Sequence, residues 1–198
     1  MKTIFLAILG LALAHTGFTQ TDEEIQYVLR KEQITIKGST NINKFECKLD
    51  LGYVIDTLQI KVKRINGDFD FTGLNLHIPV KAFNCKYRLM TSEFRALLRA
   101  KEFPYLNLKI GSAEHEVPNK MIMYMLLQVA DRSQEELLQD CYIDHAGEEL
   151  ILGGQHRIYL TSYDITPPRK FFGAVVVRDE LDISFEVVLE RQKENEPH

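Results

Sequence analysis

One local group of side chains in this sequence could coordinate a metal ion: Asp140, Cys141, Asp144 and His145. Carboxylate, thiolate and imidazole groups are all metal ligands, but a mixed set of this kind binds only when its geometry is fixed. The group falls in a polar and acidic stretch from residue 130 to residue 147. We therefore interpret it as part of a solvated loop, and we expect no metal or other cofactor.

The sequence also lacks the common catalytic motifs, since it contains no G-x-S-x-G, H-E-x-x-H, P-loop or G-x-G-x-x-G segment. Among its histidines, His77 alternates opposite to apolar side chains and is expected to face outward. His156 shares its face with Ile158 and Leu160, so it is a candidate polar group in the interior. These observations favour a protein that is not an enzyme. Hydrolase or isomerase chemistry that involves His156 is the alternative.

Residues 1–19 have the composition of a cleaved secretory signal peptide. Lys2 precedes an uncharged apolar run that ends at Ala14 and is too short for a bilayer-spanning helix of about 20 residues. The small residues Ala12 and Ala14 suit signal peptidase, and cleavage follows Ala14 or lies a few residues later, near Thr19. We therefore expect an exported protein, periplasmic or secreted, with no transmembrane segment.

The remaining residues, 20–198, are enough for a single domain with one core. The whole chain has 24 lysines and arginines against 28 aspartates and glutamates, a formal net charge of −4. Its densest basic group includes Lys61 and Lys63, which alternate with Ile60 and Val62 and so belong to the solvent face of a strand. Because the basic residues are dispersed among acidic ones, we expect no nucleic-acid partner.

Most of the chain alternates apolar and polar residues with the period of two that is typical of strands with one buried face. We expect such strands over residues 25–29, 33–37, 43–49, 58–65, 68–80, 106–110 and 121–129. The last strand, 175–189, is long, and Leu181 and Ile183 begin a regular apolar row on one of its faces. Pro167 and Pro168 lack backbone donors, so strand pairing must stop there. The chain therefore ends in a hairpin with a rigid corner.

The strand over residues 68–80 contains a predicted bulge. Asn66-Gly67 before it is a strong signal for a two-residue hairpin turn. The apolar residues Phe69 and Phe71 have odd numbers, whereas those from Leu74 onward have even numbers, and Gly73 lies at the change. An extra residue at a glycine is what a bulge supplies, and bulges let a sheet bend enough to close into a barrel.

The middle of the chain is rich in methionine and then in acidic residues. Three of the five methionines lie within residues 121–129. Methionine is flexible, so it suits a cavity that receives a long apolar ligand; a strand buried on both faces, with methionine filling gaps, is the alternative. The acidic stretch that follows is expected to be a short helix from Ser133 to Asp140 or a long hairpin loop.

One helix interrupts the predicted strands. Thr91 or Ser92 is its expected N-cap, and Phe94 and Leu97 share an apolar face at helical spacing. Pro104 marks the return to extended chain. A helix of this kind commonly covers one end of a barrel, which would direct Phe94 and Leu97 inward.

Four segments, taken in order, resemble motifs of the YceI-like, polyisoprenoid-binding family. They are GSTNINKF at residues 38–45, the helix with its aromatic-proline step at 90–105, TSYDITPP at 161–168, and the last strand with VVVRDELDISF. Their order and spacing extend over residues 33–190, nearly the whole chain after the signal peptide. Where the family usually carries L-x-I-x-G-V-T, this chain has the methionine-rich strand and the acidic stretch.

The resemblance implies a mainly β fold: an eight-stranded, antiparallel, up-and-down, lipocalin-like barrel with one short helix near its mouth. It also implies an exported protein that holds a long-chain apolar lipid, isoprenoid or quinone-like, in the interior. Such a ligand needs apolar area rather than reactive groups. The residues expected in the cavity wall are Phe69, Phe71, Leu74, Leu76, Phe94, Leu97, Leu106, Leu108, Met123, Met125, Leu160, Leu181, Ile183 and Phe185.

Further expectations concern the head group and the cysteines. Arg95 and Arg99 on the helix, together with His156, are candidates for contacting a polar head group. Cys47 and Cys85 each lie beside a segment that the resemblance places in the barrel wall, so we expect a disulfide between them. Two functions fit the sequence. One is a lipid carrier, and the other is a barrel with a filled interior that acts through its surface as an envelope or secreted interaction module.

Overall fold

The computed structural model describes residues 23–49, 59–65, 68–117 and 120–192. The predicted signal peptide and the Asn66-Gly67 turn lie outside these residues. Among the helices that are described, none is long and apolar enough to cross a membrane.

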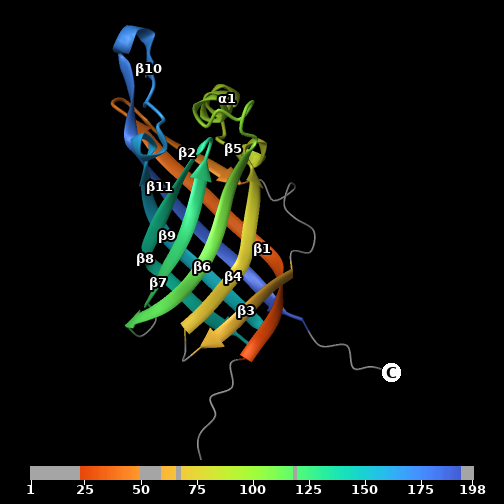
Figure 1. Cartoon of the computed structure of the whole chain (residues 1–198). Coiled ribbons are helices and arrows are strands. Elements are labelled where there is room, and N and C mark those ends of the chain that lie inside the picture. The colour runs from red at the N-terminus through yellow and green to blue at the C-terminus, as the bar shows by residue number, and fades with distance from the viewer. Residues whose placement is uncertain (1–22, 50–58, 66–67, 118–119, 193–198) are drawn as a thin grey trace, which may run out of the picture.

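Eight antiparallel strands form a closed ring (Figure 1). In order around the ring they are β1 (Glu23–Thr40), β11 (Val175–Arg191), β9 (Glu149–Tyr159), β8 (Arg132–Ala146), β7 (Lys120–Val129), β6 (Tyr105–Val117), β4 (Asp68–Pro79) and β3 (Gln59–Ile65). β3 pairs with β1 and closes the ring. The short strands β2 (Lys44–Leu49) and β5 (Phe83–Asn84) extend the sheet beside the upper half of β1. The predicted eight-stranded antiparallel barrel is confirmed.

β1 joins two segments that the sequence pattern separates, residues 25–29 and 33–37. The register against β11 shifts between Leu29 and Lys31, so Arg30 is an extra residue in β1. Before the shift the inward side chains have odd numbers, as at Tyr27, and after it they have even numbers, as at Ile36, which is buried. A bulge reverses the faces of a strand without ending it, so alternation alone shows two strands.

β4 contains the bulge that the sequence predicts at Gly73. Asp70 pairs with Ser112 and Leu74 pairs with Ile110, so three residues of β4 face a single residue of β6. The shift brings Phe71 and Leu74 onto the same inner face, where both are buried. The extra length of β4 lets the wall curve at this point.

The acidic stretch after the methionine-rich strand is neither a helix nor a loop, so both expectations are wrong. It forms β8, which pairs with β7 and β9. Met121 pairs with Cys141 and Met123 pairs with Leu138, so two residues of β8 oppose one of β7. Because of this bulge, the inward residues Leu138 and Cys141 are three positions apart and do not follow a period of two. The outer face of the strand is charged, so its sequence resembles that of a solvated segment.

The pairing of β8 also determines where the side chains of the candidate metal group lie. Cys141 is buried, whereas Asp140, Asp144 and His145 are exposed. Within the described ranges, no group of three or more histidine, cysteine, aspartate or glutamate side chains could hold a metal ion. In β7, Met121 and Met123 face the interior, and Leu126 is exposed, so only one face of this strand is deeply buried.

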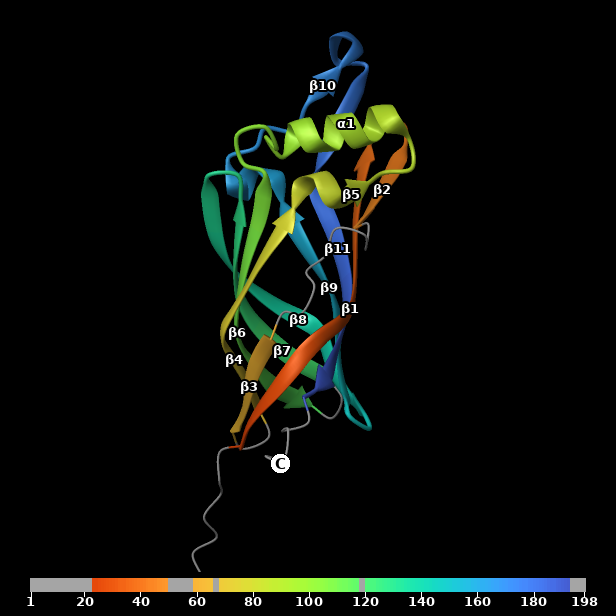
Figure 2. The ribbon, with the colours of Figure 1, turned by 90° about the vertical axis from the view of Figure 1, so that its right-hand side faces the viewer.

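The helix α1 (Arg88–Leu97) lies across one end of the barrel (Figure 2). The predicted cap at Thr91 or Ser92 is wrong, because the helix begins at Arg88 with Tyr87 as its N-cap. Thr91 is the first residue whose amide closes a turn of the helix, on the Tyr87 carbonyl, and its hydroxyl accepts a hydrogen bond from the Cys85 amide at 3.0 Å. The polar residue therefore bridges the helix to the preceding chain and does not start the helix.

A second feature of this end is the connection between β9 and β11. It contains the 3₁₀ turn η3 (Leu160–Tyr163), the short strand β10 (Arg169–Lys170) and the turn η4 (Phe171–Gly173). β10 pairs with the start of β11, and the hairpin that they form projects beyond the barrel (Figures 1 and 2). The helix and this hairpin therefore lie at the same end of the molecule, which we call the mouth end.

Candidate ligand-binding cavity

The barrel interior holds two separate hydrophobic clusters. The upper cluster, beneath α1, includes Phe83 and Phe94, and the lower cluster includes Phe71. Among the described residues, only Leu76 and Met125 pack against both clusters, and both are partly buried. A compact domain usually has one contiguous core. The interior of this barrel is instead divided along its axis.

A cavity of about 140 Å³ is lined by residues from both clusters. α1 contributes Phe94 to its wall, while β7 contributes Met123 and Met125. Several inward side chains keep exposed surface although they lie inside the barrel: Ile34, Leu76, Leu108, Ile110, Met125, Ile183 and Phe185. These residues pair across neighbouring strands, as Ile34 does with Phe185 and Ile110 with Met125. The gap between the clusters is therefore bounded by apolar side chains from around the ring.

The structure brings most of the predicted wall residues to this cavity. Those that line it are Phe71, Leu74, Leu76, Phe94, Leu106, Leu108, Met123, Met125, Leu181, Ile183 and Phe185. Three others lie apart from it. Phe69 stacks on Phe71 in the lower cluster, Leu160 is buried in the upper cluster at the end of β9, and Leu97 packs against that cluster from α1.

Other lining residues were not predicted, and they fall into two groups. Ile34 and Ile36 lie in an expected strand, so their alternation was a usable signal. Leu138 lies in the acidic stretch, and Phe83 lies in a two-residue strand, where no periodicity exists. Only strand pairing shows that these last two side chains reach the interior.

A partly buried polar network lies beside the cavity. His156 lines the cavity, and its Nε2 lies 2.8 Å from Oε2 of Glu136. The Tyr163 hydroxyl donates to Oε1 of the same carboxylate at 2.5 Å. The side chains of His156 and Glu136 are 15% and 16% exposed. Both carboxylate oxygens therefore have partners, which offsets the desolvation of the charge. The interior position expected for His156 agrees with this geometry.

From the surroundings of the Tyr163 hydroxyl we predict that the free energy of unfolding falls at alkaline pH. Burial, together with its hydrogen bond to Glu136, raises the pKa of Tyr163 above its ordinary value of about 10. The folded protein keeps a proton that the unfolded chain loses, so this contribution is complete below about pH 10 and is lost as the pH rises further. Urea unfolding should show a loss of up to about 1.4 kcal/mol per pH unit that is absent in Tyr163→Phe. Tyr124→Phe, at an exposed tyrosine, is the control; equal slopes in all three proteins would contradict the assignment.

The second ionisable residue of the cavity wall is Glu32. Burial raises the pKa of Glu32. No lysine or arginine of the described chain lines the cavity. The electrostatic potential at the wall is therefore determined by carboxylates and one histidine. An anionic group of a ligand that was buried here would lack a cationic partner.

The two arginines expected at the head group lie outside the cavity. Arg95 donates to the carbonyl oxygens of Lys81 at 2.5 Å and Phe83 at 3.2 Å, and so ties α1 to the chain before it. Arg99 pairs with Asp131 at 2.8 Å and Glu102 at 2.7 Å. Both line a groove on the outer side of the helix.

A disulfide joins Cys47 to Cys85 in the upper cluster. It links β2 to the residues just before α1 and so fixes the helix over the barrel. Cys141 is a free, buried thiol. Burial and the neighbouring Asp140 carboxylate raise the pKa of Cys141 to about 11, so the thiol stays protonated and unreactive at neutral pH.

Several solved structures share this fold. No protein-family model and no curated protein matches the sequence. A polyisoprenoid-binding domain from Saccharophagus degradans, implicated in plant cell wall breakdown, has a TM-score of 0.60 at 9% identity, over 85% of this chain and 99% of that one. BcnA of Burkholderia cenocepacia has a TM-score of 0.53 at 14% identity, over 79% and 95%. A YceI protein of Campylobacter jejuni is 12% identical, with a TM-score of 0.49 over 98% and 100%. The chain has the fold of the YceI-like, polyisoprenoid-binding barrels.

Proposed function

We propose that this protein is an exported, non-enzymatic binding protein that holds a long apolar lipid, isoprenoid or quinone-like, inside its barrel. The observation that carries the proposal is the apolar cavity between two separate core clusters. The fold shared with a polyisoprenoid-binding domain supports it. An interior that served stability alone would be filled, because protein interiors are close-packed.

The size of the cavity sets a condition on this function. Sites for drug-sized ligands have volumes of roughly 300 to 1,000 Å³, and a space near 150 Å³ takes a molecule such as benzene. A cavity of about 140 Å³ therefore needs to expand before it holds a chain of several isoprene units. Met123 and Met125 are suited to this role, because unbranched thioether side chains change rotamer readily.

The wall chemistry narrows the ligand class. The described lining is apolar except for Glu32 and His156, and the Glu136 carboxylate lies directly behind His156. A phosphate or diphosphate at this depth would face carboxylates with no cation beside it. The part of the ligand inside the barrel is thus neutral, as in a prenyl chain, a prenol or a quinone.

Native mass spectrometry of protein purified without detergent tests this function, followed by organic extraction and lipid identification. We expect one equivalent of excess mass that extracts as a prenyl or quinone species. A bare polypeptide mass that stays unchanged after incubation with prenols and quinones would contradict the proposal. That outcome would favour a filled barrel that acts through its outer surface, for which the small cavity volume is the supporting observation.

The proposed export rests on residues 1–19, which precede the described part of the chain. We expect the mature protein to lack this segment. N-terminal sequencing of protein from the periplasm or the culture medium measures this directly, and retention of Met1 would overturn the proposal.

A further inference from the structure

The mouth end exposes an unusual set of apolar side chains. They are Ile42 in the loop before β2, Tyr87 and Leu89 at the start of α1, and Phe171 and Phe172 at the tip of the β10–β11 hairpin. Leu89 is 73% exposed and Phe172 is completely exposed. Single exposed apolar residues are normal, but several at one end of a molecule indicate a binding surface.

The hairpin tip holds its aromatic side chains at a conformational cost. Phe171 and Phe172 have φ angles of 51° and 53°, and Gly173 follows with φ of 90°. Left-handed backbone costs roughly 1–2 kcal/mol for a residue with a side chain. Residues held in such conformations cluster at functional sites. An ion pair of 2.6 Å between Lys170 and Glu93 connects the hairpin to α1.

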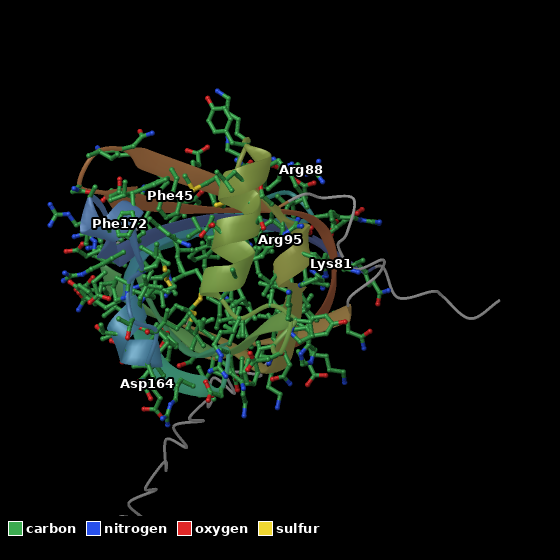
Figure 3. The ribbon with its side chains drawn as sticks, turned by 90° about the horizontal axis from the view of Figure 1, so that it is seen from above. Phe45, Lys81, Arg88, Arg95, Asp164 and Phe172 are labelled. Carbon is green, nitrogen blue, oxygen red and sulfur yellow. A yellow bond between two sulfur atoms is a disulfide. The ribbon has the colours of Figure 1, made fainter. Side chains whose placement is uncertain are left out.

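Basic residues lie at the same end of the molecule, on and beside α1 (Figure 3). From Val80 to Glu102 the sequence has six basic residues and two acidic ones, although the whole chain has a net charge of −4. A groove of about 850 Å³ on the outer side of α1 is lined by Lys86, Arg88, Arg95, Arg99 and Lys101, with Glu102 as its one acidic residue. Figure 3 looks onto this end, with Arg88 and Arg95 on the helix and Phe172 at the edge.

We infer that the mouth end docks onto an anionic lipid bilayer. Projecting phenylalanines with adjacent lysines and arginines are the combination that lies at a lipid interface, where the rings enter the acyl boundary and the cations meet phosphates. Arg99 is neutralised by Asp131 and Glu102, and the other four cations of the α1 groove match the sign of an anionic surface. Phe94 of α1 and Leu98 at its C-cap line the cavity, so docking brings the covered end of the cavity to the membrane. The inference does not require that the cavity holds a ligand.

Co-sedimentation with vesicles tests the docking. We expect the full mature chain to bind equimolar phosphatidylcholine and phosphatidylglycerol vesicles, and to bind pure phosphatidylcholine vesicles at least tenfold more weakly. The double variant Phe171→Ala/Phe172→Ala should lose about a hundredfold in vesicle affinity, since each ring buried in lipid is worth about a tenfold change and the two factors multiply. The double variant Lys86→Glu/Arg88→Glu should lose a similar factor, and high salt should weaken wild-type binding.

Matched controls lie on the outer barrel wall, away from the mouth end. Tyr124→Ala removes an exposed aromatic residue, and Lys63→Glu/Lys109→Glu reverses two exposed charges. We expect both controls to bind vesicles as the wild type does. If the mouth-end variants and the controls bind equally well, or if wild type does not prefer anionic vesicles, the inference is overturned.

The absence of tryptophan from the chain allows a direct measurement of insertion. Phe172→Trp places a unique indole at the hairpin tip, and its emission should shift to the blue when anionic vesicles are added. Tyr124→Trp on the barrel wall should show no shift. An unshifted spectrum from Phe172→Trp with bound vesicles would rule out insertion of the tip. Because these vesicles contain no isoprenoid, the result is independent of the mass-spectrometric test of the cavity.

Discussion

The variant Cys47→Ser/Cys85→Ser is expected to unfold with a free energy about 4 kcal/mol lower than that of the wild type. The two cysteines are separated by 38 residues. Closing a loop of this length lowers the entropy of the unfolded chain, which raises the free energy of unfolding by about 4 kcal/mol. Both residues are also buried in the upper cluster, so the serines lose packing there. For a domain of this size the change corresponds to a fall in Tm of about 10 °C.

Urea unfolding under non-reducing conditions measures this loss. Cys141→Ala is the matched control, because it removes a buried sulfur that closes no loop. We expect Cys141→Ala to cost about 1–2 kcal/mol through lost packing. Reduction of the wild type should reproduce the double variant. A double variant that is less than about 1 kcal/mol below the wild type would show that the bond constrains little.

Met125→Trp is expected to abolish ligand retention while the barrel stays folded. Met125 lines the cavity and packs against both clusters, so a larger side chain there occupies the space proposed for the lipid. The ligand affinity should fall by at least about tenfold, which corresponds to 1.4 kcal/mol of lost binding free energy. Overpacking costs about 1–3 kcal/mol where a core is full, and the cavity should lower that cost here.

Leu126→Trp is the control for this experiment, because Leu126 is the next residue of β7 and faces outward. We expect it to retain ligand as the wild type does. Native mass spectrometry gives the bound fraction, and thermal unfolding reports on the fold. Equal retention by the two variants would place the ligand elsewhere than the cavity, whereas unfolding of Met125→Trp with a bare wild type would indicate a filled barrel.

Local pattern was sufficient to predict much of the architecture. Alternation identified most of the strands, though not β8, since each outward residue meets water and each inward one meets the core. The change of apolar phase at Gly73 predicted the bulge in β4, because an extra residue moves all later side chains to the other face. The resemblance of four ordered motifs then implied ring closure and the pairing of Cys47 with Cys85, which are 38 residues apart.

Tertiary structure decided the rest, because the remaining features depend on which strands become neighbours. Only pairing with β7 and β9 makes β8 a strand, and this pairing turns Glu136 toward His156. The start of α1 at Arg88 follows from the chain before it, where Arg95 and Thr91 bind backbone groups. The cavity also depends on tertiary structure. The sequence shows only that the inward residues are apolar. Whether they fill the interior depends on how side chains from eight strands meet across the barrel.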